Sequence, residues 1–542
     1  MQHREQLRKF KYSPYHALCW LASLEALSFS SCTNHLSKPD QPNIIMILAD
    51  DLGYSDLGCY GSEIQTPNLD KLAKEGLLYT QMYSCGRCWP SRSALLTGHY
   101  PRALNVDPLD TAIRNPSWVK FIPQYLKQQG YRSYHSGKWH VFGYDIGNAG
   151  FEHYYHNDGC DRNFTPDHHF LDGDTLPQPS LSDRYYSSIN ITDYLIGFLK
   201  HHQKENPRSP FFGYLSFVTP HFPLQALPED VELYRDTYKA GWDIIRDRRY
   251  RRQIASGIIN CVLTPRMPEV IPVWNLSDEK LQSEISTGEI GKAVAWEELT
   301  QEQKMFQSVK MSIHAAMVSR IDQEIGRLID ELKKMGVYNN TVIMFASDNG
   351  ASAEQIIRGD MHDKEAAPGS AATYLCLGPG WSTCSNTPFR RHKYWMDEGG
   401  IASPFIISWP EGITEKGEYR TTVCHFIDIL PTILELAGIE VTDTISPTLP
   451  GKSLCPVFDE DKNIDRSPLY FDHWNNKALR DGKWKLLSAY PENRWELFDM
   501  ETDRSECHDL ANKYPEIAGC LIEEWNSYRN YLDSLKNEKN LN

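Results

Sequence analysis

Four uninterrupted apolar runs of strand length limit the fold of this chain more than any other feature. A run without polar alternation is typical of a strand that is buried on both faces of a parallel sheet. Amphipathic helical patterns separate these runs, and alternating strands and helices predict an α/β fold with a large, mostly parallel or mixed sheet flanked by helices. The strand runs are Asn43–Ala49, Phe211–Val218, Thr341–Ala346 and Pro404–Trp409, and the helical patterns are 68–76, 122–130, 183–201 and 301–335.

The chain changes character after Pro450 and Gly451. Short strand-like pieces and one closing helical stretch predict a small antiparallel sheet with a covering helix. We therefore divide the chain into a large α/β domain over 43–449 and a C-terminal α+β subdomain over 450–542. The predicted pieces of the subdomain are the strands 469–472, 478–480, 484–488 and 495–499 and the helix 515–535.

Composition and charge exclude several classes of protein. With 41% hydrophobic and 23% charged residues, the chain has ordinary globular composition, which argues against disorder or a coiled coil. A net charge of −15 argues against a general nucleic-acid binder, although a locally basic site for an anionic substrate stays compatible with it. Beyond residue 40 no apolar run reaches 18 residues, so we expect no membrane-spanning helix in the mature chain.

The first 32 residues have the pattern of an export signal. Basic residues precede a mostly apolar stretch over 17–29, and small residues then lead to Cys32. This pattern predicts an exported protein, either periplasmic or anchored to the outer membrane as a lipoprotein cleaved at Cys32. Glu25 interrupts the apolar stretch, and the alternative is an unprocessed N-terminus.

The 13 cysteines form neither a zinc framework nor a small disulfide scaffold. Cys85 and Cys88 are separated by two residues and could be read as a redox or metal element. Cys376 and Cys384 are close enough in sequence to bridge in an oxidising compartment. The others are expected to be buried as small hydrophobic residues.

Acidic and amide side chains follow two of the predicted strands. Asp50 and Asp51 come directly after the first strand, and Asp348 and Asn349 follow the strand 341–346. Ligands of open α/β sheets bind at the carboxyl ends of the strands, and oxygen donors of this kind suit Ca²⁺ or Mg²⁺. Alone, either pair would more often cap a helix or a turn. Two pairs in matching positions predict a cation site.

The segment from Cys88 to Gly98 is the most specific feature of the sequence. Pro90 and Ser91 suit the start of a helix and Gly98 suits its end, which places Cys88 near a helix N-terminus. Chemistry alone would propose a reactive thiolate beside Arg92. The alternative is a structural cysteine that precedes an ordinary helix.

This segment resembles the signature C-x-P-S-R followed by L-T-G of the type I, formylglycine-dependent sulfatases of the alkaline phosphatase superfamily. The match is complete: Cys88, Pro90, Ser91, Arg92, Leu96, Thr97 and Gly98. The resemblance runs from about residue 43 to the C-terminus and is closest to the bacterial arylsulfatase-like branch. The motifs that support this branch begin at His221 and Lys393.

The resemblance assigns catalytic roles to six residues. Lys138 and His140, which are two apart and could face one side of an extended segment, match the lysine and histidine of the family motif. His221 and Lys393 match a sulfate-contacting histidine and a late lysine. Without the resemblance, such residues would more often be surface or loop residues. His99 and His135 are further candidates as helpers, but we expect structural roles for both. The six catalytic residues are Cys88, Arg92, Lys138, His140, His221 and Lys393.

The family mechanism implies that a maturase oxidises Cys88 to formylglycine, whose hydrate attacks the sulfur of the ester. One divalent cation, Ca²⁺ or alternatively Mg²⁺, would be held by the position-88 oxygen together with four oxygen donors. Cationic side chains would offset charge on the sulfate, and His221 or Lys393 would protonate the leaving oxygen. His140 would then release sulfate by removing a proton from the remaining hydroxyl. The four donors are Asp50, Asp51, Asp348 and Asn349.

The resemblance therefore implies a sulfatase that acts on a sulfated carbohydrate or an aryl sulfate. Two other classes stay open: a phosphoester or phosphonate hydrolase on the same scaffold, and a non-catalytic protein that binds sulfated glycans. Sugar specificity is expected in loops. Trp381 and the charged stretch 230–252 are candidates for the rim of the site.

Overall fold

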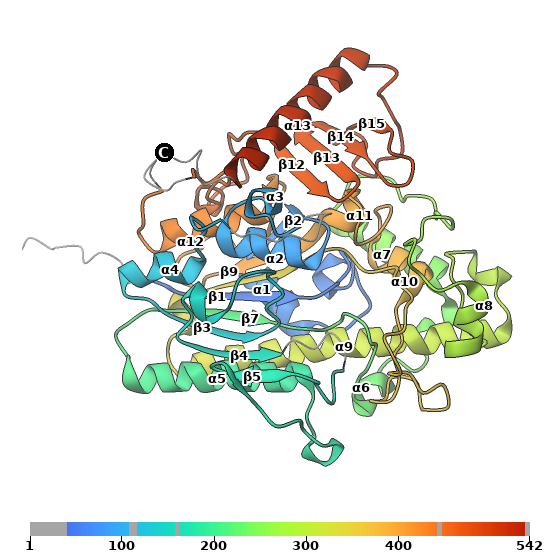
Figure 1. Cartoon of the computed structure of the whole chain (residues 1–542), viewed down its shortest axis with the longest axis horizontal. Helices are drawn as coiled ribbons and strands as arrows, with labels where there is room; N and C mark the ends of the chain where they lie inside the picture. The colour runs from blue at the N-terminus through green and yellow to red at the C-terminus, as the bar shows by residue number, and fades with distance from the viewer. Residues whose placement is uncertain (1–40, 108–115, 158–161, 442–446, 537–542) are drawn as a thin grey trace, which may run out of the picture. The chain divides into compact units, whose positions relative to one another are not determined.

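The computed structural model describes residues 41–107, 116–157, 162–441 and 447–536 (Figure 1). These residues belong to one unit that begins at Gln41. The export signal and the lipoprotein site predicted at Cys32 lie outside the described residues. Within the described ranges, no helix combines the length and the hydrophobicity needed to cross a bilayer.

A large mixed sheet forms the centre of the unit. Its strands follow the order β10-β2-β9-β8-β1-β7-β3-β4-β5-β6, and β11 also pairs with β2. The central strands β8, β1, β7, β3 and β4 run parallel, whereas β9 is antiparallel to both of its neighbours. The strand bounds are β1 Asn43–Ala49, β2 Leu77–Tyr83, β3 Arg132–Gly137, β4 His153–Asn157, β5 His169–Leu171, β6 Asp174–Thr175, β7 Phe211–Ser216, β8 Thr341–Ser347, β9 Ala402–Ser408, β10 Glu418–Arg420 and β11 Cys424–His425.

Helices cover the central strands in two groups, which Figure 1 shows on either side of β1, β7 and β3. One group includes α5, which packs on β3, β4 and β7, and α9, which packs on α5 and α1. The other includes α2, which packs on α3 and α12. The bounds are α1 Pro67–Glu75, α2 Cys88–Thr97, α3 Pro101–Leu104, α4 Ile122–Leu126, α5 Ser187–Glu205, α6 Pro228–Glu232, α7 Trp242–Ser256, α8 Asp278–Lys280, α9 Gln301–Lys334, α10 Gly378–Ser385, α11 Glu398–Ile401 and α12 Ile429–Leu436.

The apolar runs predict the central strands closely. All six residues from Ile44 to Ala49 are completely buried, as expected for a strand that is covered on both faces. The helix predicted over 183–201 instead begins at Ser187, because 181–183 form a separate turn that ends where Arg184 takes a φ of 55°. The expected α/β class is confirmed.

A second, four-stranded antiparallel sheet lies in the C-terminal part, as predicted. The order is β12-β13-β14-β15, and α13 (Pro515–Leu535) packs on β13, β14 and β15. The ring of Trp525 on α13 stacks on Tyr470, with 5.4 Å between the centroids. The division of the chain at residue 450 stays a prediction. The bounds are β12 Leu469–His473, β13 Asn476–Asp481, β14 Trp484–Ser488 and β15 Trp495–Asp499.

The bridge that we expected between Cys376 and Cys384 is not formed, and both thiols are free. Cys384 lies within α10 and packs in the main core, whereas Cys376 packs with Phe222 and Tyr374 in a separate cluster. The Cys376 thiol donates to the carbonyl of Ile356, with 3.5 Å between the two atoms. The chain between the two cysteines thus directs them into different surroundings.

A buried cluster of charges joins the C-terminal sheet to the large sheet. Lys485 of β14 is completely buried and its Nζ lies 3.0 Å from Glu398 and 2.6 Å from Glu506. Arg504 also pairs with Glu398, at 3.0 Å. Because Glu398 begins α11 just before β9, this cluster fixes the C-terminal part next to the strand that borders β8.

Replacing Lys485 should destabilise the fold far more than replacing a lysine two positions away. Lys485→Ala leaves two buried carboxylates without their shared cation, which should cost about 3–5 kcal/mol. Lys483→Ala is the control, because that side chain is 43% exposed and pairs with Asp499 at the surface, where about 0–1 kcal/mol is expected. Urea unfolding of both variants measures the difference, and equal midpoints would contradict it.

Candidate active site

Two neighbouring parallel strands bring the predicted cation ligands together. Ala49 of β1 is paired with Ser347 of β8, so the residues that follow both strands emerge at one edge of the sheet. The backbone N–H of Asp51 donates to Asp348 at 3.2 Å, and the side-chain amide of Asn349 donates to Asp51 at 2.7 Å. Asp51 takes a φ of 64°, a left-handed conformation that turns the chain directly after the strand.

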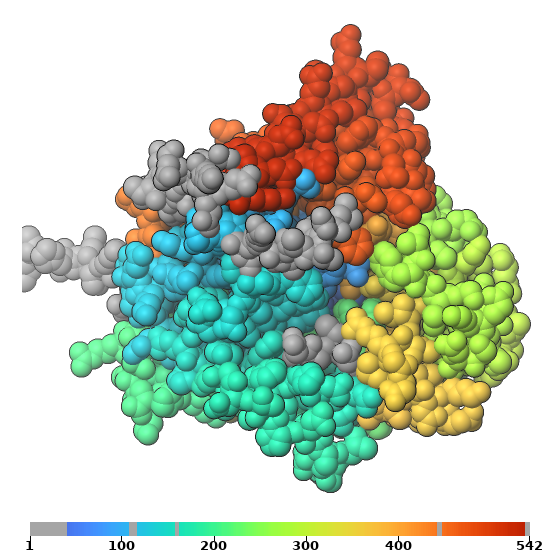
Figure 2. Space-filling model, viewed as in Figure 1, coloured from blue at the N-terminus to red at the C-terminus, as the bar shows by residue number. Residues whose placement is uncertain are grey.

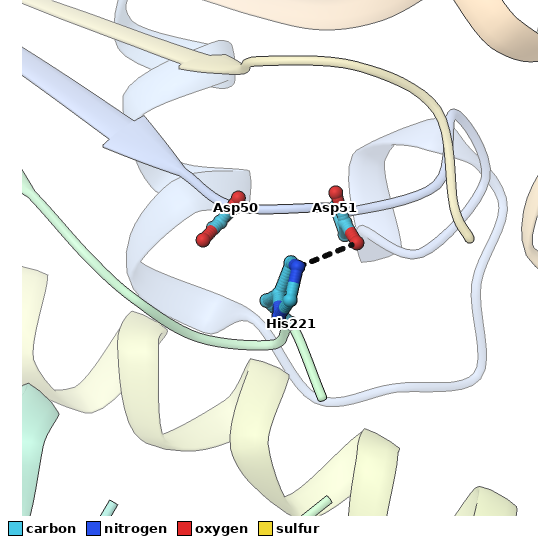
Figure 3. A group of neighbouring side chains, drawn as sticks. All are labelled: Asp50, Asp51 and His221. Atoms are coloured by element: carbon cyan, nitrogen blue, oxygen red, sulfur yellow. Dashed lines mark ion pairs between the residues drawn. The ribbon is translucent and has the colours of Figure 1, made fainter. Parts of the chain in front are cut away.

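The donors at this edge fit a divalent cation. Within the described part of the chain, the Oδ1 atoms of Asp50 and Asn349 are buried and accept no hydrogen bond. Ligand atoms of Asp50, Asp51 and His221 lie within 4.8 Å of one another, and Figure 3 shows the imidazole directed at the Asp51 carboxylate. Buried oxygen atoms without partners are costly unless an ion or a donor meets them, and hard cations prefer such ligands.

Each of the three buried carboxylates has a cationic partner from a different segment. Arg92 of α2 donates to Asp348, with nitrogen–oxygen distances of 2.9 and 2.8 Å. The Nζ of Lys138, just after β3, lies 2.5 Å from Asp50. The Nζ of Lys393 lies 2.8 Å from Asp51. The site therefore contains three buried ion pairs, each of one carboxylate and one cationic side chain.

The carboxylates nevertheless differ in how they hold a proton. Burial and the neighbouring carboxylate of Asp50 raise the pKa of Asp348 to about 7, despite the guanidinium of Arg92. Burial also acts to raise the pKa of Asp50, but the positive charges around it, led by Lys138, hold it well below the usual range. A bound cation would favour the charged form of Asp348 and so compete with its proton.

The two histidines assigned by the resemblance both lie at this site. Nδ1 of His221 donates to the carbonyl of Phe222 at 2.6 Å, so Nε2 carries a lone pair and lies 3.6 Å from Asp51. Burial lowers the pKa of His221 to about 4. We predicted an extended segment after β3, but His140 takes a left-handed conformation with a φ of 48°. Burial, followed by the charges of Lys138 and Arg92, holds the pKa of His140 well below its usual range.

Cys88 occupies the first position of α2, as the sequence predicts. It is 3% exposed, and burial raises the pKa of its thiol to about 11, even though Lys138 and Lys393 lower it. The expectation of a reactive thiolate beside Arg92 is therefore wrong. The guanidinium of Arg92 is engaged with Asp348, and desolvation of the thiol outweighs the nearby positive charges.

Several residues at the site had no signal in the sequence. Glu354 accepts from the indole N–H of Trp274 at 2.9 Å and lies 3.2 Å from the Nζ of Lys393. Ser216, the last residue of β7, accepts from the guanidinium of Arg92. Glu354 follows Asp348 by six positions in a loop without periodic pattern, so nothing in the sequence separates it from an ordinary surface glutamate.

The structure places other candidates away from the chemistry. Trp381 was a candidate for the rim, but it is completely buried. Its ring packs among Trp242, Trp296 and Tyr238, and its indole N–H donates to the carbonyl of Gln307. Within 230–252, Asp230 is buried against Arg320 and Arg249 is buried against Asp56 and Glu63, so neither is free to contact a substrate. His99 and His135 are buried too, which fits structural roles.

The unmodified Cys88 thiol should react slowly with iodoacetamide. With a pKa of about 11, only about one thiol in a thousand is ionised at pH 8, and the rate should rise about tenfold per pH unit toward pH 10. We would measure labelling by peptide mass spectrometry in protein made without a modifying enzyme and treated with a chelator. Exposed Cys520 is the internal reference. Labelling of Cys88 as fast as Cys520 at pH 8 would contradict the raised pKa.

Comparison with known proteins agrees with this geometry. The sequence model of the Sulfatase family matches residues 42–439, and that of the N-sulphoglucosamine sulphohydrolase C-terminal region matches 390–530. The chain is 31% identical to an arylsulfatase of Klebsiella aerogenes over 78% of this chain and 93% of that protein. It is 26% identical to an N-acetylglucosamine-6-O-sulfatase of Bacteroides thetaiotaomicron, over 94% and 91% of the two chains.

A solved structure shows the same fold. The crystal structure of Ps i-CgsB in complex with k-i-k-neocarrahexaose superposes with a TM-score of 0.63 at 24% identity, covering 90% of this chain and 93% of that one. The family model spans the central sheet and the site at its edge, from before β1 to beyond α12. The chain therefore belongs to the type I sulfatase family of the alkaline phosphatase superfamily and is an enzyme that hydrolyses sulfate esters.

Proposed function

We propose that the enzyme releases sulfate from a sulfated carbohydrate, using formylglycine at position 88 and one divalent cation, Ca²⁺ or alternatively Mg²⁺. The observation that carries this proposal is the position of Cys88. It begins a helix whose Arg92 is bound to Asp348, and the charges of Lys138, Lys393 and Asp50 all act on its thiol. A nucleophile at that position would face both the cation ligands and the cationic side chains.

Asp50, Asp51, Asp348 and Asn349 would hold the cation, together with the oxygen at position 88. When bound, the cation supplies positive charge that makes a hydroxyl nucleophile more acidic and withdraws electrons from the sulfate. The unpartnered oxygens of Asp50 and Asn349 support this assignment. His221 lies closer to the ligand set than the resemblance implies, because its Nε2 is 3.6 Å from Asp51.

The other side chains would orient the sulfate and move protons. Arg92, Lys138 and Lys393 supply fixed positive charge that stabilises developing negative charge on the sulfate oxygens. Lys393, held between Asp51 and Glu354, is kept protonated and is positioned to donate to the leaving oxygen. His140 is kept neutral by burial and charge, as a general base must be before it accepts a proton.

The activities of two relatives support a carbohydrate or aryl sulfate as substrate, because one is an arylsulfatase and the other is an N-acetylglucosamine-6-O-sulfatase. A phosphoester hydrolase of this superfamily would usually use two metals and a Ser or Thr nucleophile. Among the described residues, one group of Asp, Glu, His or Cys side chains is placed to hold an ion, and position 88 is a cysteine. A glycan-binding protein would need neither the buried lysines nor the signature.

We also propose export, on the N-terminal pattern alone.

The nucleophile and the reaction are tested together. Enzyme produced with a maturase should yield a peptide in which Cys88 has lost its sulfur and gained an aldehyde oxygen. This enzyme should favour matched aryl or sugar sulfates over phosphates in kcat/KM, because turnover depends on fit to the transition state. Cys88→Ala should abolish turnover, and Lys393→Ala should lower kcat by about 10²-fold or more. Full activity with an intact Cys88 thiol, or a preference for phosphate, would overturn the proposal.

Removing the cation should abolish activity, and Ca²⁺ or Mg²⁺ should restore it. Asp348→Asn removes one negative charge from the ligand set, so its half-saturating Ca²⁺ concentration should rise about tenfold or more. Asp322→Asn is the matched control, because Asp322 is also completely buried but belongs to α9. Its carboxylate accepts hydrogen bonds from backbone N–H groups in the first turn of α1 and is not one of the proposed ligands. A second readout is the rise of Tm with added Ca²⁺, which Asp348→Asn should weaken. Restoration by Zn²⁺ alone would contradict a hard-cation site.

A further inference from the structure

Four aromatic side chains meet beside Cys88 and take no part in the chemistry proposed above. We call Trp89, Trp274, Tyr394 and Trp474 the rim cluster. Their ring centroids lie 5.0 Å apart for Trp274 and Tyr394, 5.8 Å for Tyr394 and Trp474, and 6.1 Å for Trp89 and Trp474. The three tryptophans are half-buried. Four segments far apart in sequence thus place aromatic rings at one partly exposed position.

The rim cluster is directly joined to the catalytic residues. Trp89 follows Cys88 and Tyr394 follows Lys393 in the chain, and the ring of Trp89 lies 5.7 Å from that of His140. The Trp89 ring also contacts Phe142, which is 39% exposed. Figure 2 shows a hollow in the surface where blue, cyan, lime-green, gold and orange segments meet. The part of a substrate that adjoins a sulfate at Cys88 would therefore lie close to these rings.

The backbone at these residues is strained. His140, Tyr394 and Trp474 have φ angles of 48°, 92° and 56°, a region that bulky side chains rarely adopt. Among the described non-glycine residues with positive φ, these three are the ones with aromatic rings, and all three belong to or touch the rim cluster. Such strain persists where the surroundings enforce it, and it is concentrated at ligand-binding sites.

Hydrogen bonds to carboxylates fix the ring planes. The indole N–H of Trp89 donates to Asp107 at 3.0 Å, and that of Trp274 donates to Glu354 at 2.9 Å. The guanidinium of Arg87 lies 4.9, 5.2 and 5.5 Å from the rings of Trp89, Trp274 and Trp474. Rings that are oriented before a ligand arrives lose little freedom on binding, which is the condition for a specific subsite.

The charged groups at the rim are paired with one another. Nη2 of Arg87 lies 3.4 Å from Glu354, whereas its Nε and Nη1 are buried and make no hydrogen bond to the described part of the chain. Asp107 contacts the imidazole of His473 at 2.8 Å. The rim therefore presents aromatic surface whose neighbouring charged groups already have partners, next to a site where three cationic side chains pair with three carboxylates. A second anionic group on the substrate would gain little here and would lie near Asp107 and Glu354.

We propose that the rim cluster is the leaving-group subsite, where the rings of Trp274 and Trp474 bind the apolar face of an otherwise uncharged pyranose. This inference rests on the proposed sulfatase function and names the substrate class within it: a monosulfated neutral sugar. Aromatic rings contribute apolar contact area at small conformational cost and suit the C–H face of a sugar ring. The sulfate then extends toward Cys88 while the sugar stays at the rim.

Trp474 is the residue to change, because it makes no hydrogen bond to Glu354 and its replacement leaves Lys393 in place. Trp474→Asn removes the ring and suits the left-handed backbone, since asparagine tolerates positive φ. Trp474→Tyr keeps an aromatic ring. Trp409→Ala is the matched control, because Trp409 is also half-buried but lies far from the site. It follows β9, which runs antiparallel to β8 and therefore ends at the opposite edge of the sheet.

The measurement compares KM for sugar sulfates with the Ki of inorganic sulfate, which occupies only the sulfate site. The substrates are monosulfates of glucose, galactose, N-acetylglucosamine and N-acetylgalactosamine, with glucosamine 2-N,6-O-disulfate and 4-nitrophenyl sulfate as comparisons. We expect Trp474→Asn to raise KM for the best neutral sugar about tenfold, with kcat and the Ki of sulfate within about twofold of wild type. Trp474→Tyr should recover most of the loss, and Trp409→Ala should match wild type.

The outcomes separate this inference from the function on which it rests. If the mature wild-type enzyme hydrolyses neither sugar nor aryl sulfates, the proposed function fails and the inference falls with it. An active wild-type enzyme whose KM is unchanged in Trp474→Asn would overturn the subsite alone. A preference for the disulfated sugar, or activity confined to 4-nitrophenyl sulfate, would overturn the assignment of a neutral sugar.

Discussion

The site depends on three carboxylates that are buried within a few ångströms of one another. Asp50 and Asp348 are completely buried and Asp51 is 3% exposed, and like charges in such a place repel strongly. Burial, followed by repulsion from Asp50, raises the pKa of Asp348 to about 7. A fold can keep these groups together only if positive charge is supplied from nearby, by side chains and by an ion.

The required positive charge determines which segments must converge at the sheet edge. Arg92 comes from α2, Lys138 from the end of β3, and Lys393 from the loop before α11, and each binds a different carboxylate. Because Arg92 lies four residues after Cys88 in the same helix, its bond to Asp348 also fixes the position of Cys88. Charge pairing thus fixes the position of the proposed nucleophile, although burial raises the pKa of its unmodified thiol.

Much of the fold follows from the sequence because burial on both faces leaves an apolar run with few alternatives. β1, β14, β15 and α13 have the predicted bounds, and the two acidic pairs meet because adjacent parallel strands end at one edge. What the pattern could not show was long-range pairing. Local chemistry alone suggested a thiolate at Cys88, which burial disfavours, because desolvation depends on packing from distant segments. Trp381 was misplaced at the rim for the same reason, since only the tertiary structure surrounds it with Trp242 and Trp296.

Glu354 connects the two halves of the site in a way that no local motif could reveal. One carboxylate oxygen lies 3.2 Å from the Nζ of Lys393, and the other accepts from Trp274 and lies 3.4 Å from Arg87. A single buried charge therefore orients both Lys393, which we propose to act on the sulfate ester, and Trp274, which we propose to contact the leaving group. Displacing the Trp274 ring would also shift the group that holds Lys393. If the two proposals hold, recognition of the sugar and stabilisation of the departing oxygen share Glu354 as one hydrogen-bonded support. A ligand that fits the rim poorly would then also disturb the charge arrangement around Lys393.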